Sequence, residues 1–130
     1  MIGINGVLHE VAEKNGVDAE KFEKLYSMLL DEIKDALPDV KLIILEPFVL
    51  KTAEREEHWD YYNTETRKRA EASKRIADKY GAAFVPLMDK FFELSKIAPE
   101  THWLMDGIHP TCAGHTFMAD EWMKAFELIR

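Results

Sequence analysis

Asp106 and His109 lie three residues apart in the stretch Asp-Gly-Ile-His-Pro, and their side chains could act together as an acid–base pair. A turn of this length can bring the carboxylate to Nδ1 of the imidazole. Nε2 would then be free to accept a proton from a hydroxyl group, and the carboxylate would stabilise the imidazolium that forms. An acid and a histidine at this spacing also occur in loops as structural or solvated groups, so the surrounding sequence has to decide between the two interpretations.

Three segments have the composition of strands that could position such a loop. Residues 40–45 form a nearly continuous aliphatic run that Pro47 stops, as expected of a parallel strand buried on both faces. Residues 82–85 form a second short strand, which ends before Pro86. Residues 1–5 look like the end of a third strand that runs into a polar turn at Asn5 and Gly6.

Four helices are expected between and after these strands. Asp18 is a good cap for the first helix, which Pro38 prevents from continuing. Residues 63–80, with Gly81 as a C-terminal glycine, and residues 88–97 form the next two, and after a loop over residues 98–110 Thr111 caps the last. The apolar positions expected to face the core are Phe22, Leu25, Leu29, Ile33 and Leu37 in the first helix and Phe117, Met118, Trp122, Ala125, Phe126 and Ile129 in the last. Alternating strands and helices predict one α/β domain, a three-layer α/β/α sandwich around a parallel sheet.

The stretch from Asp106 to His115, Asp-Gly-Ile-His-Pro-Thr-Cys-Ala-Gly-His, resembles the last conserved block of the SGNH/GDSL-type serine ester hydrolases. Residues 2–5, Ile-Gly-Ile-Asn, resemble the third block of that family. Residues 36–39, 45–48 and 80–87 are similar to the corresponding segments of members like the bacterial acetylesterases, so the resemblance covers nearly the whole chain.

The resemblance implies a flavodoxin-like α/β/α fold and a reaction in which a serine attacks an ester carbonyl group. His109 would transfer the serine proton, Asp106 would orient His109, and the amide of Asn5 would donate to the oxyanion, with Gly3 beside it in the substrate site. A structural turn is the alternative role for Asn5. The expected substrate is a small-molecule ester with a short acyl group, such as an acetylated carbohydrate.

The sequence departs from the family in two places. The opening Gly-Asp-Ser block should precede Asn5, so we expect residues 1–130 to be an amino-terminally truncated hydrolase domain that is inactive alone. Ser27, Ser73 and Ser95 all fall in expected helices, without the tight turn after a strand that presents a nucleophile. Gly6 stands where the family commonly has aspartate, which would loosen the turn at Asn5.

Aromatic side chains near the expected site have two possible roles. Trp59, with Tyr61 and Tyr62, follows the strand that Pro47 ends, where α/β proteins place substrate loops. These rings could instead pack over the sheet edge or meet another subunit. Trp103 precedes Asp106 and could shield the acid–base pair from water, with plain core packing as the alternative.

Composition excludes several other classes of function. A net charge of −7 disfavours nucleic acid and anionic membranes as partners, and no apolar run is long enough for a membrane span or a signal peptide. The five histidines match no compact ligand spacing and Cys112 is the only cysteine, so we expect no metal, no cofactor and a cytoplasmic location. The alternative to an enzyme is a non-catalytic module in which the exposed edge of the strand containing Ile2 pairs with another chain, most simply as a homo-oligomer.

Overall fold

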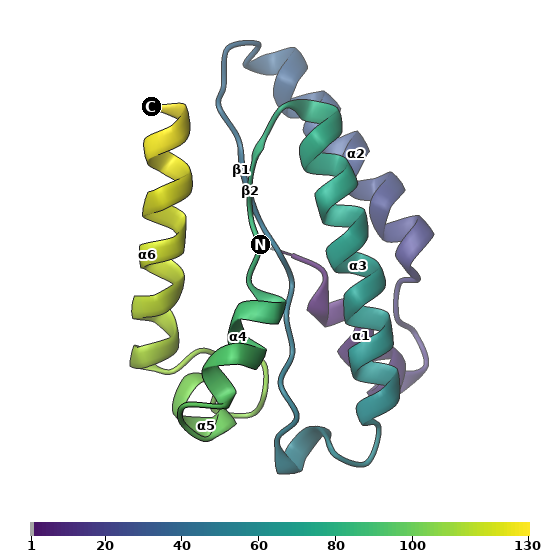
Figure 1. The fold of residues 1–130 in the computed structure, drawn as a ribbon. Coiled ribbons are helices and arrows are strands. Elements are labelled where there is room, and N and C mark those ends of the chain that lie inside the picture. Colours follow the sequence, from purple (N-terminus) through teal and green to yellow (C-terminus); the bar gives the residue numbers. More distant parts are fainter. Residues whose placement is uncertain (1) are drawn as a thin grey trace.

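The computed structural model describes residues 2–130 and has a short parallel sheet between two layers of helices (Figure 1). α6 covers one face of the sheet, and α3 covers the other with α2 packed against it. The predicted three-layer α/β/α arrangement is therefore confirmed. The elements follow the chain in the order α1 (Ile4–Glu13), α2 (Ala19–Ala36), β1 (Ile43–Leu45), the 3-10 helix η1 (Ala53–Arg55), α3 (Trp59–Tyr80), β2 (Ala83–Val85), α4 (Met88–Ser95), α5 (Glu100–Trp103) and α6 (Cys112–Ile129).

β1 and β2 pair in parallel, with Ile44 opposite Phe84. Both strands were predicted, but each is shorter than the aliphatic run that encodes it. Ile44 is buried, whereas Ile43 and Leu45 are only half-buried, so β1 is not enclosed on both faces as predicted. The carboxyl ends of both strands point to the end of the molecule where η1, α4 and α5 lie (Figure 1).

The helix caps show why the sequence breaks where it does. Asp18 accepts a hydrogen bond from the backbone N–H of Lys21 at 2.8 Å and begins α2. Gly81 ends α3 in the left-handed conformation, with a φ of 61° that suits glycine. The hydroxyl of Thr111 accepts a hydrogen bond from the N–H of Gly114 at the start of α6. These three predicted boundaries are confirmed.

The carboxylate of Glu46 joins the ends of the two strands. It follows β1 directly and accepts hydrogen bonds from the backbone N–H groups of Leu87 and Met88, at 2.6 and 2.8 Å. These groups lie at the start of α4, whose first N–H groups have no partner within the helix. One side chain therefore holds α4 beside the carboxyl end of the sheet.

The prediction of a third strand over residues 1–5 is wrong for the residues that the structure describes. Ile2 and Gly3 have no regular secondary structure, Gly3 has a φ of 130°, and α1 begins at Ile4; Met1 lies outside the described residues. Ile4, Val7, Leu8 and Val11 recur at helical spacing and pack into the core, with Val7 fully buried. Helical periodicity therefore decides this segment, in place of the short aliphatic run at its start.

Several residues predicted to face the core are exposed. They are Leu25 and Leu29 on α2, Leu37 just after α2, and Trp122 and Phe126 on α6. The N–H of Ala83 donates to the carbonyl of Leu42, and the N–H of Glu46 donates to the carbonyl of Val85. The backbone groups of Leu42, Ile44 and Glu46, in and beside β1, therefore point toward β2. The backbone groups of Ile43 and Leu45 consequently point away from β2, along an edge that no strand within residues 2–130 pairs. Apolar side chains of α2 and α6 stay exposed because no described part of the chain covers them.

No helix within the described residues is both long and apolar enough to cross a lipid bilayer.

Candidate active site

The Asp106–His109 loop lies between α5 and α6 and is held by its own backbone. Leu104 and Pro110 form an antiparallel bridge, and the N–H of Met105 donates to the carbonyl of His109 at 2.8 Å. Leu104 and Ile108 are both buried in the main core cluster. The segment predicted as a plain loop therefore contains a short helix and a closed turn anchored at two buried positions.

Gly107 makes this turn possible. Its φ is 86°, a conformation that L-residues with a side chain rarely adopt. Its carbonyl accepts a hydrogen bond from the N–H of Leu50 at 2.8 Å, and a Cβ atom on Gly107 would lie 2.4 Å from the carbonyl oxygen of Leu50. The segment after β1 thus packs directly against the backbone of the Asp106–His109 turn.

The structure brings Asp106 and His109 together as predicted from their spacing. Oδ2 of Asp106 lies 2.9 Å from Nδ1 of His109, and Oδ1 accepts hydrogen bonds from the backbone N–H groups of Ile108 and His109 at 3.1 and 2.9 Å. Burial raises the pKa of the Asp106 carboxyl, but the hydrogen bonds from the backbone and ring of His109 and from the N–H of Ile108 outweigh it and hold the pKa at about 2.

An aspartate with this pKa is ionised at neutral pH and can only accept hydrogen bonds. Nδ1 of His109 must therefore carry the proton in their shared hydrogen bond, which leaves the lone pair of the neutral ring on Nε2. The His109 side chain is 65% exposed and the Asp106 side chain 27% exposed. This arrangement can act as a general base, and most of the imidazole side chain is exposed.

Arg55 is a member of this site that the sequence analysis missed. Its Nη2 donates to Oδ2 of Asp106 at 2.9 Å, and its Nε donates to the backbone carbonyl of the same residue at 2.9 Å. Arg55 ends η1, in the segment after β1 where substrate-facing residues were expected. The one feature of the sequence that could have identified Arg55 is its position as a cation among the acidic residues 54, 56 and 57.

Asn5 and Gly3 lie at the start of α1. Gly3 is the N-cap residue, and a Cβ atom on it would lie 3.4 Å from Pro47, which follows β1. Asn5 is in the first helical turn and is exposed. Within residues 2–130 its side chain has no hydrogen-bond partner, so the structure leaves its amide available but does not join it to His109.

The two tryptophans predicted to lie in the substrate site, Trp59 and Trp103, both pack against other parts of the chain. Trp59 begins α3, is half-buried and meets the ring of Phe92 edge to face at a centroid distance of 6.2 Å. The indole N–H of Trp103 donates to the carbonyl of Leu94 at 3.0 Å. Tyr62 is buried, whereas Tyr61 is exposed beside Trp59 on the rim of a surface hollow. None of these four rings hydrogen-bonds to His109 or Asp106.

The three serines lie on helices, as predicted. Ser27 is within α2, Ser73 is fully buried within α3, and the hydroxyl of Ser95 donates to the carbonyl of Phe92 at the end of α4. Within residues 2–130 none of them forms a hydrogen bond with His109.

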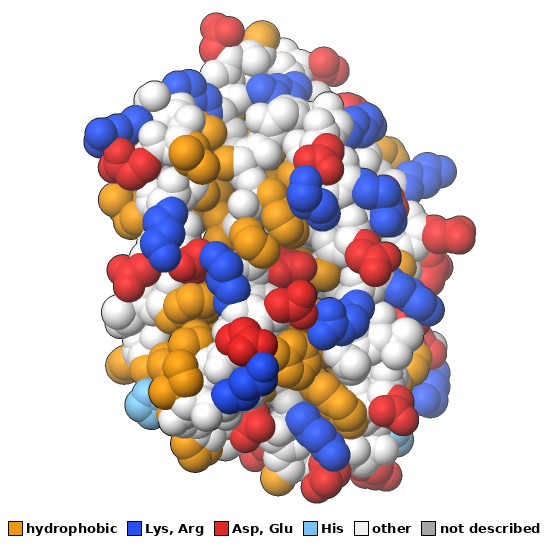
Figure 2. Space-filling view, viewed as in Figure 1, with side chains coloured by type: hydrophobic (Ala, Val, Ile, Leu, Met, Phe, Trp, Pro, Cys, Tyr) orange, Lys and Arg blue, Asp and Glu red, His pale blue; other side chains and the backbone are white. Residues whose placement is uncertain are grey.

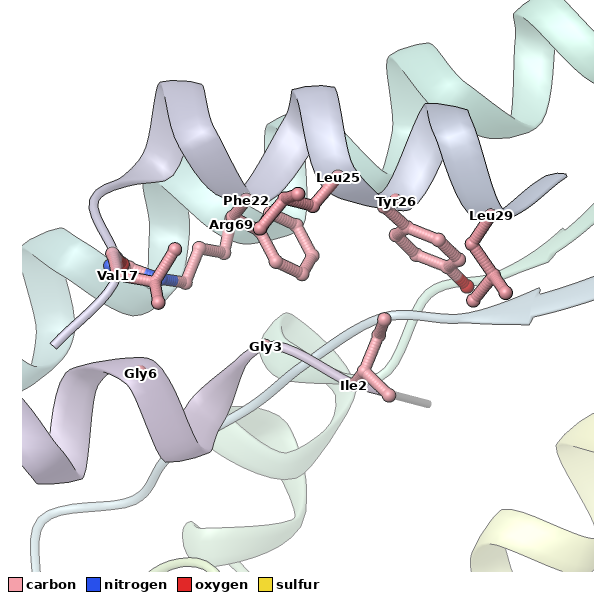
Figure 3. A pocket seen from close by; sticks show the side chains of 9 residues that line it. All are labelled: Ile2, Gly3, Gly6, Val17, Phe22, Leu25, Tyr26, Leu29 and Arg69. Carbon is pink, nitrogen blue, oxygen red and sulfur yellow. The ribbon is translucent and has the colours of Figure 1, made fainter. Parts of the chain in front are cut away.

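The face shown in Figure 2 and the cavity between α1 and α2 show other features of the surface. Acidic and basic side chains are interspersed on the face shown in Figure 2, and most basic residues of α3 pair with acids, as in Arg75–Glu23 and Lys68–Glu65. A largely apolar cavity of about 300 Å³ lies between α1 and α2, bordered by Gly3, Phe22, Leu29 and the buried Arg69 (Figure 3). The described residues contain no group of His, Cys, Asp or Glu side chains placed to hold a metal ion.

Comparisons with known proteins agree on the family. Residues 1–117 match the model of the GDSL-like lipase/acylhydrolase family. A protein from Parabacteroides merdae assigned as a GDSL-like lipase has 26% sequence identity and a TM-score of 0.91, covering 98% of this chain and 58% of its own. The acetylxylan esterase Axe2 from Geobacillus stearothermophilus has 24% identity and a TM-score of 0.79, with 96% and 56% covered. No curated protein sequence matches the chain. The chain therefore spans less than three fifths of the length of these solved structures.

Proposed function

Because the chain belongs to the GDSL-like lipase/acylhydrolase family, we propose that it supplies the acid–base half of a serine carboxylic ester hydrolase. The observation that carries this proposal is the 2.9 Å contact between Nδ1 of His109 and an ionised Asp106, in a His109 side chain that is 65% exposed. The serine nucleophile comes from polypeptide outside residues 1–130, and these residues alone are inactive.

In the proposed reaction the serine hydroxyl oxygen bonds to the ester carbonyl carbon, and Nε2 of His109 accepts the proton of that hydroxyl. Asp106 stabilises the imidazolium, and the amide of Asn5 donates to the oxyanion. The imidazolium then protonates the departing alcohol, which leaves an acyl-serine. Water deprotonated by the same nitrogen releases the acid and restores the serine.

We propose short acyl esters, including acetylated carbohydrates, as substrates. Asp106, His109 and the start of α1 occupy the carboxyl end of a parallel sheet, where α/β proteins bind ligands, and Axe2, which shares this fold, is an acetylxylan esterase. Gly3, Trp59 and Trp103 are the residues of this chain that we place nearest the substrate. The exposed ring of His109 gives a small ester direct access from solvent.

A chimaera tests the function. This chain would be joined behind the part of the Parabacteroides merdae protein that precedes its matched region; about 42% of that protein lies outside the match. We expect the folded chimaera to hydrolyse 4-nitrophenyl acetate and to gain one fluorophosphonate adduct, with both lost in His109→Ala. The 130-residue chain should gain no adduct on Ser27, Ser73 or Ser95. A folded chimaera without hydrolysis, or an adduct on the chain alone, would contradict the proposal.

The unpaired edge of β1 supports a second candidate, which is self-association. The homo-oligomer was predicted through a strand containing Ile2, but the free backbone groups belong to Ile43 and Leu45. Trp122 and Phe126 are exposed on α6 and border Ile43. Leu25 and Leu29 are exposed on α2, where they line a cavity together with Ile2 and Gly3. A second copy pairing here would bury both the backbone groups and the apolar side chains.

Light scattering after size exclusion measures this association. We expect a dimer at about 100 µM that Trp122→Glu converts to a monomer, since a charge beside Ile43 opposes burial of the edge. Ile97→Glu, at an exposed apolar position beyond α4, is the matched control and should leave the dimer intact. A monomer at every concentration would remove self-association as a function.

A further inference from the structure

We infer that Arg55 is a positioning residue for the proposed reaction, because it holds the Asp106 carboxylate in the orientation that His109 needs. The inference rests on the proposed function for its purpose, but the contacts that carry it belong to this chain alone. Arg55 does not touch the reacting atoms and acts through Asp106.

Arg55 donates two hydrogen bonds to Asp106. Nε donates to the backbone carbonyl and Nη2 donates to Oδ2, each at 2.9 Å. A planar guanidinium that bonds the main chain and the side chain of one residue fixes the side-chain torsions between them. Oδ1 is already held by the N–H groups of Ile108 and His109. Arg55 therefore adds the constraint on the oxygen that faces the imidazole.

This constraint matters because water can compete with His109 for the hydrogen bond to Oδ2 of Asp106. His109 is mostly exposed, so its Nδ1–H alone is a weak anchor for the carboxylate. Arg55 is only 14% exposed and occupies the second direction from which water could approach Oδ2. When Arg55 and His109 both donate to Oδ2, the position of this oxygen relative to Nδ1 is fixed. This in turn fixes the tautomer of the ring and the direction in which Nε2 points.

Contacts with residues other than Asp106 also hold Arg55 in place. Its backbone N–H donates to the carbonyl of Thr52, its Nη1 lies 3.4 Å from the hydroxyl of Tyr62, and its guanidinium carbon is 5.3 Å from the centroid of that ring. Tyr62 is buried in the core. The arginine is thus supported from the opposite side, as a group that positions another must be.

Three variants of the 130-residue chain separate positioning from packing and from charge. Arg55→Met keeps the aliphatic stem against the turn and removes both donors. Arg55→Lys keeps the charge but has one nitrogen, which cannot reach the carbonyl and Oδ2 in the same geometry. Arg75→Met removes an arginine from the exposed Arg75–Glu23 pair and is the matched control.

The measurement is the proton NMR signal of Nδ1–H of His109 and its exchange with water. In Arg55→Met we expect exchange to be faster by at least about tenfold, as for a hydrogen bond to a charged group that loses its fixed geometry. Arg55→Lys should recover only part of the protection, and Arg75→Met should match the unsubstituted chain. Backbone amide spectra show in each case that the fold is retained.

Unchanged exchange in Arg55→Met with a retained fold would overturn the inference, and full recovery in Arg55→Lys would show that charge alone suffices. If Arg55→Met loses the fold, Arg55→Lys decides the question by the same signal. Neither readout requires hydrolysis, so a chimaera that lacks esterase activity would end the proposed function without touching this result.

Discussion

Acid should weaken the fold through Asp106, and the size of the effect follows from its pKa. Hydrogen bonds lower the pKa of Asp106 from an ordinary 3.8 to about 2 against the effect of burial. A carboxyl with a lowered pKa in the folded state stabilises that state at pH values above 3.8. This contribution is lost as the pH falls through about 2, because the unfolded chain takes up the proton first.

The magnitude follows from linkage. Each pKa unit corresponds to about 1.36 kcal/mol, so the drop from 3.8 to about 2 contributes about 2.4 kcal/mol to the free energy of unfolding at neutral pH. About 2 kcal/mol of this should be lost at pH 2, where half of the folded molecules carry the proton. Asp106→Asn has no carboxyl at this position and should not show this loss.

Urea unfolding of both proteins at pH 7 and pH 2 isolates the effect. Other carboxyls, such as Glu23, whose pKa is lowered by hydrogen bonds from Arg75, are present in both proteins and cancel in the comparison. We expect the stability advantage of the unsubstituted chain over Asp106→Asn to shrink by about 2 kcal/mol between the two pH values. Parallel losses in the two proteins would show that the hydrogen bonds to Asp106 do not hold its pKa low.

Three further substitutions test the supports of the site, each by the midpoint of urea unfolding. Gly107→Ala should lower the free energy of unfolding by about 1–3 kcal/mol, because φ is positive and the new Cβ atom would meet the carbonyl of Leu50; an unchanged midpoint would contradict the strain. Glu46→Ala should lower the free energy of unfolding by about 1 kcal/mol, because the backbone N–H groups of Leu87 and Met88 lose their acceptor. The control is Glu54→Ala, which removes an exposed acid with no ion pair in the described structure and should change the free energy of unfolding little. Thr111→Ala should cost about 1 kcal/mol at the start of α6, and equal stability would show that the cap is dispensable.

Local signals in the sequence were sufficient for the elements that depend on local chemistry. Asp18, Gly81 and Thr111 set helix ends through hydrogen bonds or torsions within a few residues, so their roles could be predicted without knowledge of the rest of the chain. The Asp106–His109 contact was predictable for the same reason, since both groups belong to one turn. The family resemblance added the interpretation of that turn. The match over residues 1–117 confirms the family, and the role of the turn stays a prediction.

Features that depend on distant residues were missed. Arg55 meets Asp106 across 51 positions of sequence, and no pattern near either residue specifies that pairing. The strand predicted at residues 1–5 failed because Ile2 and Ile4 fit both a strand and the start of a helix, and the burial of Val7 decides between them. Leu25 and Leu29 were placed in the core because periodicity shows which face is apolar but not whether anything covers it.

The supports of Asp106 explain why the site can exist in a chain with so small a sheet. The carboxylate is held by backbone donors of its own turn, the turn is fastened to Leu50 through Gly107, and Arg55 approaches from η1. Leu50 and Arg55 both belong to the chain that follows β1, so a single segment carries two of these supports. The geometry of the acid–base pair therefore depends on the β1–η1 segment and the α5–α6 loop, and not on the unpaired edge of β1. If so, blocking that edge with a charge at Trp122, which borders Ile43, should leave the Nδ1–H signal of His109 unchanged, whereas Gly107→Ala should disturb it even where the protein still folds.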